Sequence, residues 1–221
     1  MEEEAAFRSW RGASSLPWYI AGSQLLGVAS VVITGVWMGH FRGGYAWDGS
    51  SQEFNVHPLC MVLAMIFLYG DGIVAVFQYH DANNIPHMYS LHSWCGMLTF
   101  VLFIAQWLLG FCFFLFPWTT TWLRSLYLPL HVFFGLSLFG LAVATCLLGI
   151  MEKLLFAISD TYSAYAPEGI LANTLGIMLL AYGVLVGYVV TRDEFKRPPH
   201  PEEEALSVHF KTLTEGGAVS P

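Results

Sequence analysis

Charge is scarce in this sequence. Only 11% of its 221 residues are charged, while 56% are hydrophobic, and the mean hydropathy is +0.56. A soluble globule of this size needs more charge to cover its surface, which excludes most cytosolic enzymes. Basic residues are scarcer still, since nine Lys and Arg against 16 Asp and Glu give a net charge of −7. Nucleic acid is excluded as a partner because no basic stripe can neutralise phosphates, and an integral protein of the lipid bilayer remains.

Several local motifs are also missing. The four cysteines lie inside apolar runs and form no CxxC pair, so we expect buried thiols and no disulfide framework. The chain has no HExxH, no GxSxG and no glycine-rich phosphate loop, which removes the common templates of soluble enzymes. The acidic N-terminus leads into an apolar run too long for a cleaved signal peptide. We therefore expect residues 1–15 to form a cytosolic tail before a retained first span near residues 18–38.

Long stretches without charge are what the sequence does have. A helix needs about 20 apolar residues to cross roughly 30 Å of hydrocarbon. Five uncharged stretches predict an all-α, polytopic membrane helix bundle over residues 16–191, with about five spans and no strand pattern. These stretches are residues 12–41, 54–70, 82–123, 125–151 and 169–191. The change to PPHPEEE near the C-terminus predicts a disordered cytosolic tail over residues 192–221.

Five spans conflict with the distribution of basic residues. An odd number places the tails on opposite sides, yet both tails are basic, and cytosolic segments carry the excess of Lys and Arg. Five spans leave six of the nine basic residues in the cytosol, whereas two crossings over residues 57–80 raise this to seven. The disagreement points to Gly70-Asp71-Gly72. A re-entrant hairpin broken at these glycines and the loss of a segment are both open explanations.

Three histidines occupy equivalent positions. His57, His92 and His131 each lie where a polar stretch gives way to an apolar one. An imidazole inside a membrane is costly, so three at matched depth favour a functional role over interfacial side chains bonded to nearby backbone. Neutral imidazole is a good ligand for haem iron, and the apolar runs supply aromatic and small residues for a flat macrocycle. Zinc is the weaker option because the three histidines begin different helices.

Several words of the sequence closely resemble the cytochrome b-561 family. They are NVHPLCM, SLHSWCG, LRSLYLPLHVFFG, EGILAN and ALSVHFKTLTEG, and the resemblance covers almost the whole chain. Members are six-helix proteins with two haems b that pass electrons from cytosolic ascorbate to an acceptor across the membrane. SLHSW and FKTLTEG look most like the secretory-vesicle (chromaffin granule) member. The resemblance implies an ascorbate-dependent reductase of the vesicle membrane that reduces intravesicular monodehydroascorbate, and a homodimer is a further expectation.

The resemblance also implies roles for individual residues. His57 and His92 match the axial iron ligands of the lumenal haem, and His131 matches one ligand of the cytosolic haem. The remaining matches lie at the rims of the two haem sites and at the two faces where substrates bind. They are His87, Met88, Tyr89, Ser90 and Glu152 beside the lumenal haem, Lys196 beside a propionate of the cytosolic haem, Arg124 as the contact to cytosolic ascorbate, and His80 near the acceptor.

The chain departs from the family after Phe67-Leu68-Tyr69-Gly70. There the family continues through the end of a helix, a basic loop and a third helix with the other ligand of the cytosolic haem. This sequence instead resumes at residues 73–80, which resemble the last turns of that third helix. About 30 residues are missing, enough for two half-helices and a loop. One alternative to full activity follows: a shortened form with one haem or none that carries no electrons across the membrane. The resemblance leaves a second alternative open, a ferric reductase, which differs only in its electron acceptor.

Overall fold

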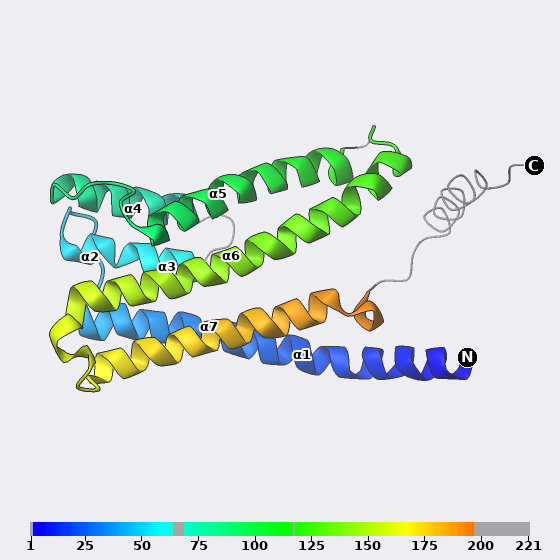
Figure 1. Ribbon diagram of the computed structural model, residues 1–221, viewed down its shortest axis with the longest axis horizontal. Coiled ribbons are helices and arrows are strands. Elements are labelled where there is room, and N and C mark those ends of the chain that lie inside the picture. Colours follow the sequence, from blue (N-terminus) through cyan, green and yellow to red (C-terminus); the bar gives the residue numbers. More distant parts are fainter. Residues whose placement is uncertain (1, 64–68, 117, 197–221) are drawn as a thin grey trace, which may run out of the picture.

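The described chain is a bundle of helices. The computed structural model describes residues 2–63, 69–116 and 118–196, and every regular element in these ranges is a helix, which confirms the all-α class (Figure 1). Four of the described helices are long and apolar enough to cross a membrane. They are α1 (Glu2–Val36) with the π-helical turn η1 (Trp37–Phe41), α5 (Leu91–Gly110) with η2 (Phe111–Leu115), α6 (Thr121–Tyr162) and α7 (Pro167–Thr191).

A helical hairpin stands in place of the second predicted span. After the short α2 (Ser51–Phe54), α3 covers Val56–Leu63 and α4 covers Tyr69–Ala82. At 1.5 Å per residue α3 and α4 are about 12 and 21 Å long, so neither reaches across roughly 30 Å of hydrocarbon. They run antiparallel, because Gly72 near the start of α4 lies against Cys60 of α3 while the far end of α4 contacts α2. The uncharged stretch was counted as a span because a lack of charge does not reveal a reversal of direction.

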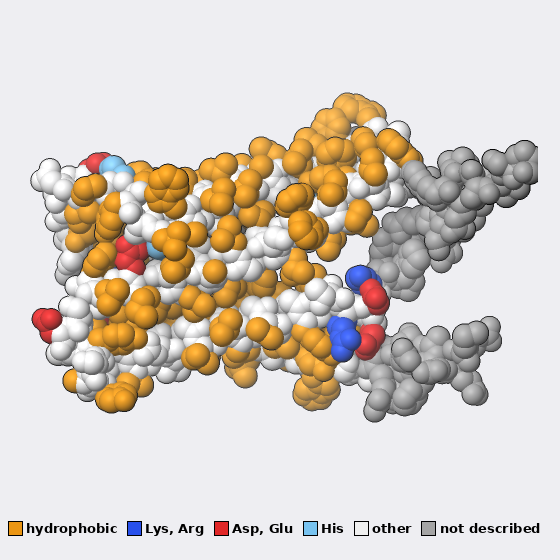
Figure 2. All heavy atoms as spheres, in the orientation of Figure 1, with side chains coloured by type: hydrophobic (Ala, Val, Ile, Leu, Met, Phe, Trp, Pro, Cys, Tyr) orange, Lys and Arg blue, Asp and Glu red, His pale blue; other side chains and the backbone are white. Residues whose placement is uncertain are grey.

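Because the hairpin does not cross, the start of the first span and the finish of the last span lie at the same end of the bundle. α1 begins and α7 finishes at the same end in Figure 1, where the connection from α5 to α6 also lies. Arg124, Arg192 and Lys196 belong to this end, and the basic side chains visible in Figure 2 gather there. Four crossings therefore remove the conflict between an odd number of spans and two basic tails.

The two predicted tails are described in part. Residues 2–15, expected as an N-terminal tail, already belong to α1. The C-terminal tail is described only to Lys196, after the 3-10 turn η3 (Asp193–Phe195), and the rest of it lies outside the described residues.

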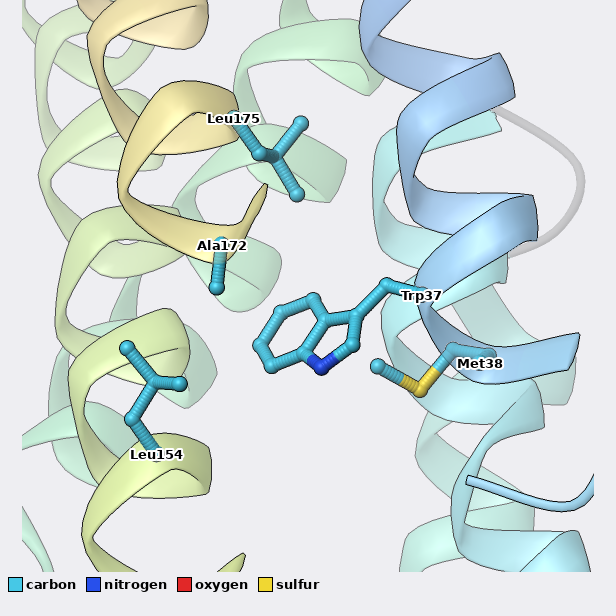
Figure 3. Packing of buried hydrophobic residues seen from close by; sticks show 5 residues of the cluster. All are labelled: Trp37, Met38, Leu154, Ala172 and Leu175. Atoms are coloured by element: carbon cyan, nitrogen blue, oxygen red, sulfur yellow. The ribbon is translucent and has the colours of Figure 1, made fainter. Parts of the chain in front are cut away.

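The hydrophobic core lies at the end of the bundle opposite to Arg124, Arg192 and Lys196. Trp37 and Met38 of η1, directly after α1, face α6 and α7, and all five residues of the cluster are at most 1% exposed (Figure 3). The other three are Leu154, Ala172 and Leu175. Many other large apolar side chains point outward, and they cover the face shown in Figure 2 along its length. Such a surface suits lipid, so few buried side chains hold the helices together.

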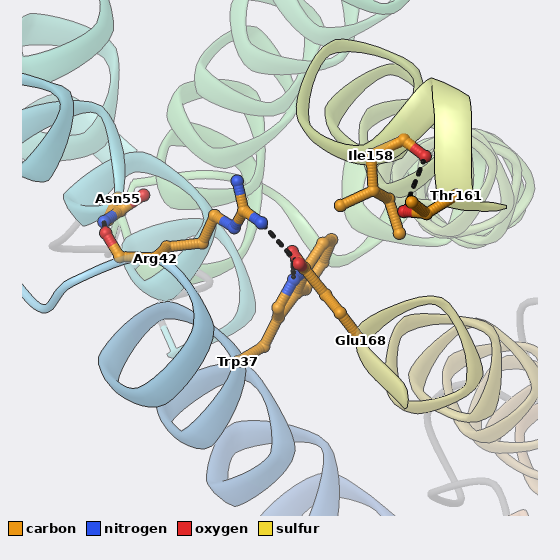
Figure 4. Close-up of polar contacts among 6 residues, drawn as sticks. All are labelled: Trp37, Arg42, Asn55, Ile158, Thr161 and Glu168. Atoms are coloured by element: carbon orange, nitrogen blue, oxygen red, sulfur yellow. Dashed lines mark hydrogen bonds and ion pairs between the residues drawn. The ribbon is translucent and has the colours of Figure 1, made fainter. Parts of the chain in front are cut away.

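A buried carboxylate joins α7 to the end of the first span. Glu168, 6% exposed, accepts a hydrogen bond of 2.8 Å from Nε1 of Trp37 and pairs with the guanidinium of Arg42 (Figure 4). The amide of Asn55 extends the network by donating to the carbonyl groups of Arg42 (3.0 Å) and Gly44 (2.7 Å). A buried carboxylate needs such partners because its desolvation is costly. The network ties the first and last spans to the segment that leads into the hairpin.

α6 changes direction just before this network. Its 42 residues contain a kink at Ile158, whose φ and ψ of −143° and 28° are not helical. The hydroxyl of Thr161 donates to the carbonyl oxygen of Ile158 at 3.5 Å (Figure 4). The kink precedes the short connection to α7, whose first turn carries Glu168.

The four crossings predict that the two termini share one side of the membrane. Protease-cleavable tags at the N- and C-termini should be cut together in sealed vesicles, because the first and last spans have their free ends at the same end of the bundle. A tag inserted at residues 163–166, between α6 and α7, should be protected in the same vesicles. Cleavage of one terminal tag with protection of the other would contradict four crossings and restore five.

Removing the buried carboxylate should destabilise the fold. Glu168→Ala leaves Arg42 without its partner, and we expect the free energy of unfolding in detergent micelles to fall by about 3 kcal/mol. Glu194→Ala is the matched control, because Glu194 is exposed and lies 4.0 Å from Arg192 in a surface pair. Such a pair contributes less than about 1 kcal/mol. If the two substitutions lower the free energy of unfolding equally, the buried network stabilises the fold no more than a surface ion pair does.

Candidate functional site

A cavity opens between the hairpin, α5 and α6 near the end of the bundle that carries the core. It has a volume of about 180 Å³ and mostly apolar walls, to which Phe54, Phe77, Phe100 and Phe156 contribute. The residues that the sequence assigned to one haem site gather around it. They are His57, His80, His87, Met88, Tyr89, Ser90, His92 and Glu152.

Two imidazoles face each other across this cavity. The ring centroids of His57 and His92 lie 6.0 Å apart, and the ring planes are inclined by 82°. Nδ1 of His57 lies 3.0 Å from the carbonyl oxygen of Gly72, and Nδ1 of His92 lies 3.0 Å from that of Thr145. A carbonyl oxygen only accepts, so each Nδ1 carries the proton and each Nε2 keeps a free lone pair. This is the tautomer that binds a metal through Nε2, with the ring oriented by its other nitrogen.

The separation of the two rings fits a metal ion held between them. With a metal–nitrogen bond of about 2 Å and about 1.1 Å from nitrogen to ring centre, two opposed imidazoles have centroids roughly 6 Å apart. The distance between His57 and His92 matches this value. Bis-imidazole ligation in an apolar, aromatic cavity is the chemistry of haem iron, so the residues present fit the haem predicted for this pair.

Glycines let the backbone approach both imidazoles. A Cβ on Gly149 of α6 would lie 2.7 Å from Cε1 of His92, closer than any real contact. A Cβ on Gly72 would lie 3.0 Å from Cβ of Cys60, a tight contact between α4 and α3 at the point where His57 bonds the Gly72 carbonyl. The sequence did not single out Gly149 or Thr145. Their four-residue spacing on one helix face was visible, but small residues at that spacing are common in membrane helices.

Two further histidines stack at the rim of the cavity. The rings of His80 and His87 lie 5.6 Å apart at 20°, and Tyr89 stacks on His80 with centroids 6.4 Å apart. His87 also contacts Asp81, with 2.9 Å between Nε2 and Oδ1. The structure thus brings the predicted acceptor-side histidine together with the predicted border segment at one surface.

The start of α5 shapes the rest of the rim. Ser90 caps the helix by accepting from the backbone N–H of Ser93, which in turn donates its hydroxyl to the Ser90 carbonyl at 2.7 Å. The hydroxyl of Ser90 lies 3.2 Å from Oε2 of Glu152, which joins α5 to α6. Met88 has a left-handed backbone with φ of 55°, and its carbonyl accepts from the indole N–H of Trp94. The predicted border segment is therefore held rigidly by local hydrogen bonds.

His131 lies apart from this cavity. Its ring rests on the backbone of α5, since a Cβ on Gly110 would be 2.9 Å from Cε1 of His131, and Phe114 and Tyr127 pack around it. Nδ1 of His131 is buried and has no hydrogen-bond partner among the described residues. Within those residues no second imidazole faces it, in contrast to the pair formed by His57 and His92. The described residues therefore supply one of the ligands predicted for the second haem, His131, and no second imidazole to pair with it.

The two basic site residues lie outside the cavity as well. Arg124 donates to the carbonyl of Phe116 at 3.1 Å, near the start of α6. Lys196 pairs with Asp193 at 2.6 Å on the surface, and its ammonium holds the pKa of that carboxyl below its usual value. Both lie at the end of the bundle that carries the termini, as the sequence predicted. Their roles toward a second haem and toward ascorbate stay predictions.

Comparison with known proteins adds an independent line of argument. A family model described as eukaryotic cytochrome b561 matches residues 71–157, and so begins immediately after the glycine where the sequence departs from the family. The mouse transmembrane ascorbate-dependent reductase CYB561 is 48% identical over 94% of this chain and 96% of its own length, and the pig protein of the same name is 49% identical over 93% and 94%. The rat plasma membrane ascorbate-dependent reductase CYBRD1 is 38% identical over 92% of this chain and 83% of its own.

The length of the alignment agrees with the predicted gap. It spans 241 positions with the mouse protein, whereas 94% of this chain is about 208 residues, so about 30 positions lack a residue of this chain. Identity near one half over almost the full length of both proteins is more than a shared fold requires. With its paired histidines in place, the chain belongs to the cytochrome b561 family.

Proposed function

We propose that this chain is an ascorbate-dependent haem b reductase of a membrane, with one haem between His57 and His92 at the end of the bundle away from the termini. The observation that carries the proposal is the 6.0 Å separation of two imidazoles whose Nδ1 atoms are both committed to backbone carbonyls. When bound, haem b supplies one-electron redox chemistry. The names of the relatives support ascorbate as the reductant.

The residues of the chain supply ligation, burial and proton exchange. His57 and His92 would hold the haem iron, and the carbonyl groups of Gly72 and Thr145 fix their tautomers and raise their basicity. The aromatic walls exclude water, which lowers the local dielectric and helps to set the redox potential. His80 at the rim exchanges the proton that accompanies electron transfer to or from ascorbate. The acceptor that we propose is monodehydroascorbate in the lumen of a secretory vesicle.

A second candidate function is favoured by the environment of His131. In the two-haem pattern that the family resemblance implies, this histidine shares an iron with a residue of the missing segment. Here its Nδ1 is buried and has no hydrogen-bond partner in the described part of the chain, where Phe114 and Tyr127 are the rings around it. We therefore propose that the relay across the membrane is interrupted at this point. Redox exchange then takes place only at the membrane face near His57 and His92. Arg124 remains at the opposite face, where it can attract ascorbate.

The haem content of the purified chain tests both proposals. We expect close to one haem per chain by the pyridine haemochrome assay, with a reduced-minus-oxidised spectrum after ascorbate is added. His57→Ala and His92→Ala should each lose this haem, because one imidazole of the pair is removed. His131→Ala is the matched control and should retain it.

Two other outcomes are decisive. Two ascorbate-reducible haems per chain would show that the relay is complete and would refute the interruption at His131. Absence of haem from a folded, membrane-inserted chain would refute the haem function altogether.

A methyl group on Gly149 should disturb the site without touching a ligand. Gly149→Ala places a Cβ 2.7 Å from the His92 ring, so the imidazole must shift away from His57. We expect at least a tenfold loss in haem affinity, which corresponds to about 1.4 kcal/mol. Gly140→Ala is the control on the same helix, because nothing lies within 4 Å of its added Cβ. Titration of haem into both variants should separate them, and equal affinities would contradict the close approach of α6 to His92.

A further inference from the structure

A lysine that the sequence analysis did not single out lines the cavity. Lys153 lies on α6, beside the predicted Glu152, and its ammonium is 4.1 Å from the centre of the Phe54 ring. Among the described residues Lys153 forms neither an ion pair nor a hydrogen bond. A half-buried cation is costly unless an anion approaches it, and the aromatic ring compensates only part of that cost.

Lys153 continues the face of α6 that contacts the imidazole pair. Residues four apart lie on one face of a helix, and Thr145, Gly149 and Lys153 follow this spacing. The carbonyl of Thr145 accepts from His92, and Gly149 touches the ring of His92. Lys153 comes one turn later, about 6 Å further along the helix toward the rim.

The charges near Lys153 leave its ammonium uncompensated. Arg42 and Glu168 are the charged groups that act on it, and these two neutralise each other as an ion pair. Glu152 is next in sequence, but its carboxylate contacts Ser90 and forms no ion pair with Lys153. Lys153 thus presents an unpaired positive charge to a mostly apolar cavity, whose wall also carries the Glu152 carboxylate bonded to Ser90, one helical turn from the His92 contact.

We propose that Lys153 is an anion-binding residue of this cavity and that its partner is a propionate carboxylate of the haem held by His57 and His92. The proposal rests on the proposed haem function. Anionic oxygen is the chemistry that an ammonium recognises, and ascorbate is a second source of it. The haem carboxylate is favoured because Lys153 shares a helix face with the residues that hold His92, inside the cavity wall, whereas the stacked histidines His80 and His87 form the exposed rim.

The test compares haem b with its dimethyl ester, which lacks the carboxylates. Both are added to the full-length apoprotein in detergent, and dissociation is followed by transfer to apomyoglobin. Lys153→Met should speed the loss of haem b about tenfold while leaving the dimethyl ester unchanged, and Lys153→Arg should restore slow loss. Arg192→Met, which removes an exposed cation at the other end of the bundle, is the matched control and should affect neither ligand.

Each other outcome overturns the assignment. If Lys153→Met speeds the loss of haem b and of the ester by the same factor relative to the wild-type chain, the lysine supports the fold and binds no carboxylate. Unchanged loss of both, with slower reduction by ascorbate, would assign the charge to the reductant. If the wild-type chain binds neither ligand, the proposed haem function itself fails, and this result differs from a wild-type chain that binds both and is insensitive to Lys153.

Discussion

The hydrogen bond from an imidazole to a backbone carbonyl is the interaction on which the site depends. His57 and His92 sit on different helices, and each is oriented by a carbonyl from yet another helix, Gly72 of α4 and Thr145 of α6. A helical carbonyl has a second lone pair, so it can accept from a side chain and keep its helix intact. These two bonds therefore fix the tautomers, the ring orientations and the packing of four helices at once.

That arrangement needs close contact between backbones. In a bilayer, helices associate through packing and hydrogen bonds, because lipid is as apolar as their side chains. Gly72 and Gly149 supply the space, and the described core is small and sits beside them around Trp37. The pair of Arg42 and Glu168 closes the same end of the bundle. Rigidity is thus concentrated where the imidazoles meet, and the rest of the helix surface faces lipid.

The other end of the bundle shows what happens when one of these elements is missing. α3 and α4 are too short to reach it, and His131 is left with a buried Nδ1 that has neither a carbonyl nor a second imidazole near it among the described residues. Its surroundings still include Gly110 and two aromatic rings, as a ligand site would require. The described residues therefore provide one imidazole at this end of the bundle and two at the other.

The sequence by itself determined the membrane class and the ends of the last span within two residues, because apolar length is a local property. The family resemblance implied that His57 and His92 form a pair, and their rings lie 6.0 Å apart. Charge parity also located the anomaly at Gly70–Gly72, but it could not choose between a hairpin and a fifth span. Only the tertiary structure decided that the chain turns back, that Thr145 and Gly149 hold His92, and that Lys153 faces the cavity with no counter-ion among the described residues. These depend on which helix faces lie together, and contacts between distant segments leave no periodic signal in a sequence that is apolar on every side.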